Sequence, residues 1–100
     1  MPLERRASVT PGHVSVTLRV PAVAAARSVD VVGEFTDWRL VTMQPDDDGS
    51  LFATFDLPVG RAYRFRYLID GERWENDWAA DSYVPNDYGG DDSVIDVRKA

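Results

Sequence analysis

The sequence has 100 residues, close to the commonest size of a single domain, and 44% of them are hydrophobic. Its formal net charge of −6 argues against nucleic acid and anionic membranes as partners, because both are bound through basic surfaces. It contains no cysteine, which excludes disulfides, thiolate nucleophiles and cysteine metal sites and suits a reducing compartment.

The first twelve residues carry mixed charges and two prolines, with a weak strand pattern only at residues 7–10. We therefore predict a loose lead-in over residues 1–12, followed by a single domain over residues 13–100. No apolar run follows the charged residues at the start. We expect neither a signal peptide nor a membrane span, and hence a cytoplasmic protein.

Three stretches alternate apolar with polar or charged residues, which is the period of a half-buried strand. They are residues 13–20, 51–57 and 63–69. Residues 29–35 form a β-branched run in which Gly33 indicates a bulge or bend, and residues 94–97 are expected to form the last strand. We predict an antiparallel β-sandwich, because many short strands are joined by turns and no stable helix is indicated.

The segments between these strands differ in character. Residues 22–26 have helical propensity but are too few for a stable helix, so we predict a connecting loop. Residues 45–49 form an aspartate-rich turn, and Asp70-Gly71 is a typical hairpin turn. Residues 75–93 are polar and show no strand period, and a loop of this length in a compact domain is usually functional or mobile.

Enzymatic and metal chemistry find little support in the sequence. The only histidine, His13, has no cysteine or second histidine with which to bind a transition metal. Residues 46–48 lack the ligand spacing and closing glutamate of a calcium-binding hand. The glycines do not have phosphate-loop spacing, and a small sandwich lacks the deep cleft in which paired carboxylates hydrolyse glycosides. We predict a non-enzyme with no catalytic residue, no metal and no cofactor.

Residues 63–74 combine arginines with a tryptophan. Alternation places Arg64 and Arg66 on the face opposite the core aromatics, and the Asp70-Gly71 turn brings Trp74 back beside them. An indole can stack on the apolar face of a sugar ring while charged groups bond its hydroxyls. The alternative is that both arginines pair with carboxylates on neighbouring strands and that the tryptophans are partly core.

Four segments in a fixed order carry a resemblance to a known family. They are VVGEFTDW (31–38), GSLFATFDLPVG (49–60), YRFRYLIDGERW (63–74) and DDSVIDV (91–97). With them, residues 14–97 resemble the early-set, isoamylase N-terminal-like domains, namely carbohydrate-binding module family 48 and the glycogen-binding domain of the AMP-activated protein kinase β subunit. The resemblance implies an immunoglobulin-like (early-set) antiparallel β-sandwich.

The resemblance also implies roles for individual residues. Trp38 and Trp74 match the two stacking tryptophans, although one extra residue separates Trp74 from the Asp-Gly turn. Arg66 stands where the kinase domain has a lysine that bonds glucose hydroxyls. Tyr88 falls near a loop leucine that contacts the glucan, and Asp92 falls near an asparagine before the last strand, so that two acceptors are kept but the amide donors are lost.

Two functions follow as expectations. The first is non-catalytic binding of an α-1,4-linked glucan (glycogen, starch or maltooligosaccharide), which would localise or regulate glucan metabolism. The second is a protein-interaction module that packs on a glucan-metabolising enzyme in trans, or on a second copy of itself, without binding sugar. The expected state is a monomer or weak homo-oligomer that binds neither nucleic acid nor membrane.

Overall fold

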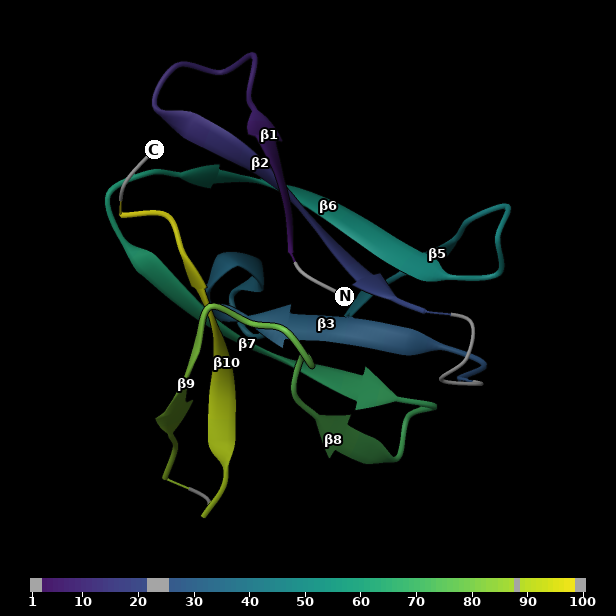
Figure 1. Ribbon diagram of the computed structural model, residues 1–100. Coiled ribbons are helices and arrows are strands. Elements are labelled where there is room, and N and C mark those ends of the chain that lie inside the picture. The colour runs from purple at the N-terminus through teal and green to yellow at the C-terminus, as the bar shows by residue number, and fades with distance from the viewer. Residues whose placement is uncertain (1–2, 22–25, 88, 99–100) are drawn as a thin grey trace.

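The computed structural model describes residues 3–21, 26–87 and 89–98, and it is a β-sandwich of two antiparallel sheets (Figure 1). Within these ranges, four strands form the smaller sheet in the order β1-β2-β6-β5. Their bounds are Glu4–Ala7 (β1), His13–Val20 (β2), Gln44–Pro45 (β5) and Leu51–Pro58 (β6). β2 and β6 pair along their whole length, from His13 opposite Pro58 to Val20 opposite Leu51.

The larger sheet has six described strands, with β4-β3-β7-β10-β9 side by side and β8 paired to β7. Their bounds are Val29–Gly33 (β3), Val41–Thr42 (β4), Ala62–Ile69 (β7), Arg73–Glu75 (β8), Ser82–Pro85 (β9) and Asp91–Asp96 (β10). β3 lies along one edge of β7. β10 and β8 lie one after the other along the opposite edge of β7. β10 pairs with residues 62–65 of β7, and β8 pairs with residues 67–69.

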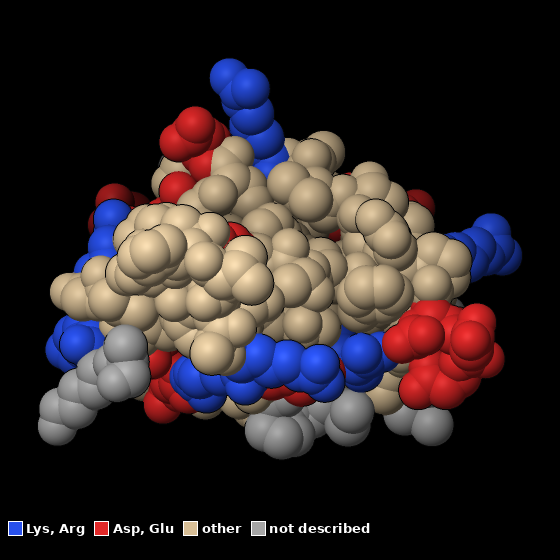
Figure 2. Space-filling view, turned by 90° about the horizontal axis from the view of Figure 1, so that it is seen from above, with Lys and Arg blue, Asp and Glu red and all other residues tan. Residues whose placement is uncertain are grey.

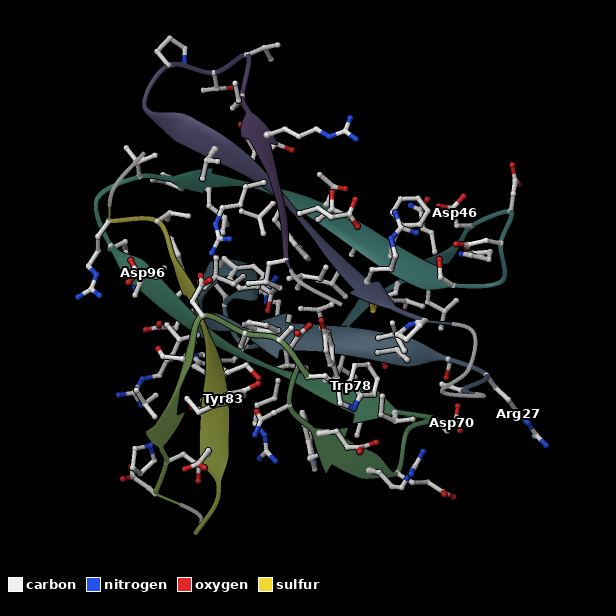
Figure 3. All side chains as sticks on the ribbon, in the orientation of Figure 1. Arg27, Asp46, Asp70, Trp78, Tyr83 and Asp96 are labelled. Carbon is white, nitrogen blue, oxygen red and sulfur yellow. The ribbon has the colours of Figure 1, made fainter. Side chains whose placement is uncertain are left out.

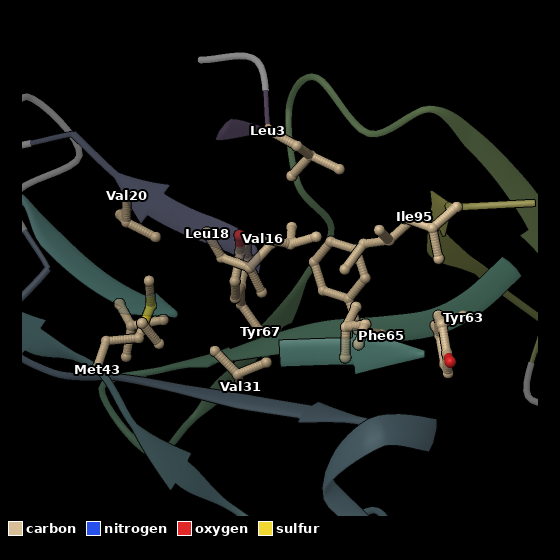
Figure 4. Packing of buried hydrophobic residues seen from close by; sticks show 14 of the residues in the cluster. Leu3, Val16, Leu18, Val20, Val31, Met43, Tyr63, Phe65, Tyr67 and Ile95 are labelled. Carbon is tan, nitrogen blue, oxygen red and sulfur yellow. The ribbon is translucent and has the colours of Figure 1, made fainter. Parts of the chain in front are cut away.

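The two sheets enclose a hydrophobic core to which β2, β3, β6 and β7 contribute most of the side chains (Figure 4). The predicted alternation of β7 is confirmed, because its four apolar side chains on one face are each at most 5% exposed: Tyr63, Phe65, Tyr67 and Ile69. Phe35 and Phe55 add an edge-to-face contact with ring centres 4.7 Å apart. Burying side chains of this size stabilises the fold by about 1.5–3 kcal/mol each.

The lead-in contains a strand that the sequence pattern did not indicate. The weak signal lay at residues 7–10, whereas Glu4–Ala7 pairs with β2. Arg19 supports this edge, since its Nε donates to Glu4 Oε2 at 2.9 Å. A terminal nitrogen of the same side chain donates to Asp46 Oδ2 at 2.8 Å, next to β5 at the other edge of the sheet. Leu3, just before β1, is buried at 8% exposure. Ion pairs and one buried leucine thus stabilise a strand whose sequence shows little alternation of apolar and polar residues.

The segment 75–93 is also more ordered than its composition indicated, since it holds β9 and parts of β8 and β10. Asp77, only 2% exposed, organises it. The Tyr67 hydroxyl donates to Asp77 Oδ2 at 2.5 Å, the Asp77 N–H donates to Ser93 Oγ at 2.8 Å, and the Tyr83 hydroxyl donates to the Asp77 carbonyl at 2.6 Å. Burial, followed by the charge of Asp77, raises the pKa of Tyr67 well above its ordinary value, so its hydroxyl remains a donor.

Charged side chains are distributed around the rim of the molecule when it is viewed from the β1 and β2 side (Figure 2). Basic and acidic groups are interspersed there, and uncharged residues fill the middle of that face.

In the described part of the chain, no helix is both long enough and apolar enough to cross a membrane.

Replacement of Tyr67 by phenylalanine tests the importance of the Asp77 cluster. The Tyr67→Phe variant leaves a buried carboxylate oxygen without its donor, so we expect a loss of about 1–3 kcal/mol in the free energy of unfolding. Tyr63→Phe is the matched control, because its hydroxyl donates to the Pro58 carbonyl at 2.7 Å and the loss should be nearer 1 kcal/mol. Urea denaturation followed by circular dichroism measures both. Equal losses would contradict a special role for Asp77.

Acid should weaken the fold, because several carboxyls have a lowered pKa in the folded state. Three of them, Asp46, Asp70 and Asp96, are labelled in Figure 3. Hydrogen bonds from Arg98 lower the pKa of Asp96 to about 2, Arg19 lowers that of Asp46, and the Ser28 and Arg27 N–H groups lower that of Asp70. Such groups stabilise the fold above their unfolded pKa of about 4, and this contribution is lost as pH falls through the folded value.

We therefore expect the urea midpoint to be nearly constant between about pH 7 and 5 and to fall between about pH 4 and 2. A midpoint that stays level down to pH 2 would contradict this account. The urea midpoint of the Asp96→Asn variant should fall less steeply with decreasing pH than that of the wild type, because the variant lacks the carboxyl whose pKa is lowered to about 2.

Candidate functional site

A groove of about 650 Å³ lies on the outer face of the six-stranded sheet, where the outward side chains of β7 meet those of its neighbours. We call it the tryptophan groove. It is lined by Val32, Trp38, Arg64, Arg66, Trp74, Asn86, Asp87 and Asp92. Four of the five site residues predicted from the sequence are among these: Trp38, Arg66, Trp74 and Asp92. The fifth, Tyr88, lies outside the described residues.

Trp38 reaches the groove from a tight turn that follows β3. The sequence predicted a strand through residue 35, but the strand ends at Gly33 and Glu34–Thr36 form a 3-10 turn, η2. The Trp38 N–H donates to the Gly33 carbonyl at 2.9 Å. Trp38 has φ of 59°, a left-handed conformation that is costly for a bulky residue and is typical of functional turns. The turn leaves its side chain 51% exposed.

Trp74 reaches the groove by the predicted hairpin. Asp70 and Gly71 both have positive φ, and the Glu72 N–H donates to the Ile69 carbonyl at 3.0 Å, as in a type I′ turn. Ile69 pairs with Arg73, so Glu72 is accommodated as one extra loop residue and Trp74 lies opposite Leu68, on the arginine face. Trp74 is 48% exposed.

The turn of this hairpin is anchored to a distant part of the chain. Asp70 Oδ1 accepts hydrogen bonds from the main-chain N–H groups of Arg27 and Ser28, at 2.7 and 2.9 Å. Arg27 and Asp70 lie together at one end of the molecule in Figure 3. The anchor limits the freedom of the segment that carries Trp74.

The two arginines of the groove form no ion pair with a carboxylate in the described part of the chain. Among the described residues no ion pair involves Arg64 or Arg66, whereas Arg5, Arg19, Arg61, Arg73 and Arg98 all have one. The Arg66 guanidinium carbon lies 5.8 Å from the centre of the Trp74 ring. Arg66 Nε is buried and has no hydrogen-bond partner in the described structure. The structural alternative of cross-strand ion pairs is therefore not realised here.

The groove offers stacking surfaces and balanced charges. Two guanidinium groups provide donors, and the carboxylates of Asp87 and Asp92 provide acceptors. Because the two cations and two anions offset each other, the lining suits a neutral ligand with many hydroxyl groups better than a strongly charged one. In the described ranges, no three His, Cys, Asp or Glu side chains are grouped so that they could hold a metal ion.

Sequence reasoning missed three of the lining residues, Val32, Asn86 and Asp87, and it placed a fourth, Arg64, on the outer face without naming it as a site residue. Asn86 and Asp87 stand in a Pro-Asn-Asp run that is a recognisable turn signal. That signal could have marked the turn, but not its position beside Trp74. The third tryptophan, Trp78, is 53% exposed but does not line the groove.

A scan against protein-family models finds no match to this chain, and a search of curated proteins finds none either.

Gly33, just before the turn that carries Trp38, has no room for a side chain. A Cβ there would lie 2.6 Å from the Arg64 carbonyl and 2.8 Å from Phe65 Cβ, so β3 and β7 would have to separate. We expect Gly33→Ala to lower the free energy of unfolding by about 1–3 kcal/mol and to displace Trp38. Gly90→Ala is the control, since its Cβ meets nothing closer than 3.8 Å. Urea denaturation of both variants measures the difference, and equal stability would contradict the steric argument.

Proposed function

We propose that this protein is an immunoglobulin-like, early-set module that binds an α-1,4-linked glucan in the tryptophan groove without cleaving it. The observation that carries the proposal is the convergence of Trp38 and Trp74 on one groove. They come from separate parts of the chain, and both are about half exposed beside two arginines that form no ion pair among the described residues. The sequence resemblance to glycogen-binding domains independently favours the same two tryptophans.

The two indoles supply the apolar part of the interaction. Stacking of an aromatic ring is worth about 0.5–1.5 kcal/mol beyond the area it buries, and a glucan covering both rings would also remove their exposed surface from water. Exposing two large aromatic side chains has no benefit for folding. A ligand that covers them accounts for their position.

The polar lining supplies orientation. A sugar hydroxyl can accept a hydrogen bond from a guanidinium and donate one to a carboxylate, so Arg66 and Asp92 together match what neighbouring hydroxyls present. Each such bond contributes about 0.5–1.5 kcal/mol net. Stacking and hydrogen bonds are set against an association cost of about 4 kcal/mol or more. With burial of the apolar surface of the two rings supplying the surplus, we expect dissociation constants from about tens of micromolar to millimolar.

Affinity of this order suits a targeting module. A single weak site localises little by itself, but a glucan carries many copies of the same unit, so several sites acting together bind strongly. In this role the protein would bring a glucan-metabolising partner to its substrate or report on the presence of glucan.

Titration with maltoheptaose tests the proposal directly. Amide shifts in NMR spectra should move at residues of the groove and give a millimolar or tighter dissociation constant. Trp38→Ala and Trp74→Ala should each weaken binding about tenfold or more, since about 1.4 kcal/mol of stacking and burial is lost. Trp78→Ala is the matched control, because its ring is equally exposed but lies outside the groove.

Two outcomes would contradict the proposal. One is the absence of any shift at millimolar maltoheptaose. The other is an oligomer, detected by light scattering, that buries Trp38, because the groove would then serve a protein contact. A cello-oligosaccharide of the same length should bind more weakly, since a flat glucan does not follow two rings presented by separate turns.

A further inference from the structure

Arg66 and Asp92 come from the neighbouring strands β7 and β10 and both line the tryptophan groove, but they do not form an ion pair in the described structure. The β7–β10 pairing ends with Ser93 opposite Phe65, and continuing this register by one residue brings Asp92 opposite Arg66 on the outer face. Side chains at such positions have Cβ atoms about 4.5–5.5 Å apart, and opposite charges there normally attract. In this structure no ion pair joins the two described side chains.

Asn86 contacts the Asp92 carboxylate and fixes its position. Its Nδ2 donates to Asp92 Oδ1 at 3.1 Å, and its Oδ1 accepts from the Gly90 N–H at 3.2 Å. The Asn86 main-chain N–H also donates to the Gly90 carbonyl at 2.8 Å. Asn86 is therefore fastened to the β9–β10 connection at both its backbone and its side chain, and through Nδ2 it fixes the orientation of a carboxylate that is only 6% exposed.

Trp74 contacts the Arg66 guanidinium. The Arg66 guanidinium lies over its ring, and Arg66 Nε is left buried without a partner. A buried donor without an acceptor is costly, and a nearby carboxylate would normally satisfy it. Because Arg66 and Asp92 stay apart despite this cost, some interaction must hold the Asp92 carboxylate in its position.

We propose that Asn86 is a positioning residue that holds the Asp92 carboxylate away from Arg66, so that the groove keeps a separate donor and acceptor for its ligand. An Arg66–Asp92 ion pair would satisfy both groups internally and leave neither for a sugar. The open pair instead fits neighbouring hydroxyls, which can accept from one group and donate to the other. The consequence for binding rests on the proposed function, whereas the geometry of the pair does not.

The Asn86→Ala variant tests the geometry in the absence of sugar. We expect Asp92 to turn toward Arg66, and the NMR signal of the Arg66 Nε–H to shift and to exchange more slowly with water than in the wild type. The Arg66→Lys variant identifies that signal by its loss. Thermal unfolding of each variant, followed by circular dichroism, establishes that the fold is retained before the signals are compared.

The same variant tests the consequence for binding. Asn86→Ala should weaken maltoheptaose binding roughly two- to tenfold, the range for one lost hydrogen bond. In an Asp92→Asn background, Asn86→Ala should change affinity by less than about twofold, because the carboxylate that Asn86 is proposed to hold is no longer present. If Asn86→Ala keeps its full effect in that background, Asn86 acts through the turn or touches the ligand itself, and the inference is overturned.

Failure of this inference can be told from failure of the proposed function. If the wild type binds maltoheptaose but Asn86→Ala alters neither the Arg66 signal nor the affinity, the positioning role is wrong and glucan binding stands. If the wild type binds no glucan but the Arg66 signal changes in Asn86→Ala as expected, the positioning role stands and only the proposed function fails.

Discussion

The alternation of side chains along β7 is the constraint on which both the fold and the groove depend. Tyr63, Phe65 and Tyr67 enter the core, so Arg64 and Arg66 are forced onto the outer face. β7 pairs with β3 on one edge and with β10 and β8 on the other, and these neighbours or the turns next to them deliver the remaining lining residues. A slip of one residue in its register would bury two guanidinium groups and remove the aromatic core at the same time.

Much of the candidate site could be predicted from the sequence because its parts depend on local signals. The period of residues 63–69 and the Asp70-Gly71 turn together place Trp74 on the arginine face, and the structure has this arrangement. Trp38 was placed near the groove by resemblance. Its actual support, a 3-10 turn with two left-handed residues, has no comparable periodicity and depends on hydrogen bonds back to Gly33.

The parts that could not be predicted depend on partners far along the chain. β1 is held by Glu4 bonding to Arg19, and the 75–93 segment by Asp77 bonding to Tyr67 and Ser93. None of these pairs has a spacing that a strand or helix pattern could reveal. The contact of Asn86 with Asp92 spans only six residues, but its importance appears only when Arg66 is seen to lie opposite.

The placement of the tryptophans has a spectroscopic consequence. All three indoles lie at the surface, at 51%, 48% and 53% exposure for Trp38, Trp74 and Trp78, and the buried core contains none. Indole emission follows the polarity of its surroundings, so the native protein should emit at long wavelength, much like the unfolded chain. Intrinsic fluorescence would then report poorly on unfolding but sensitively on anything that covers the groove, with Trp78 as a constant background.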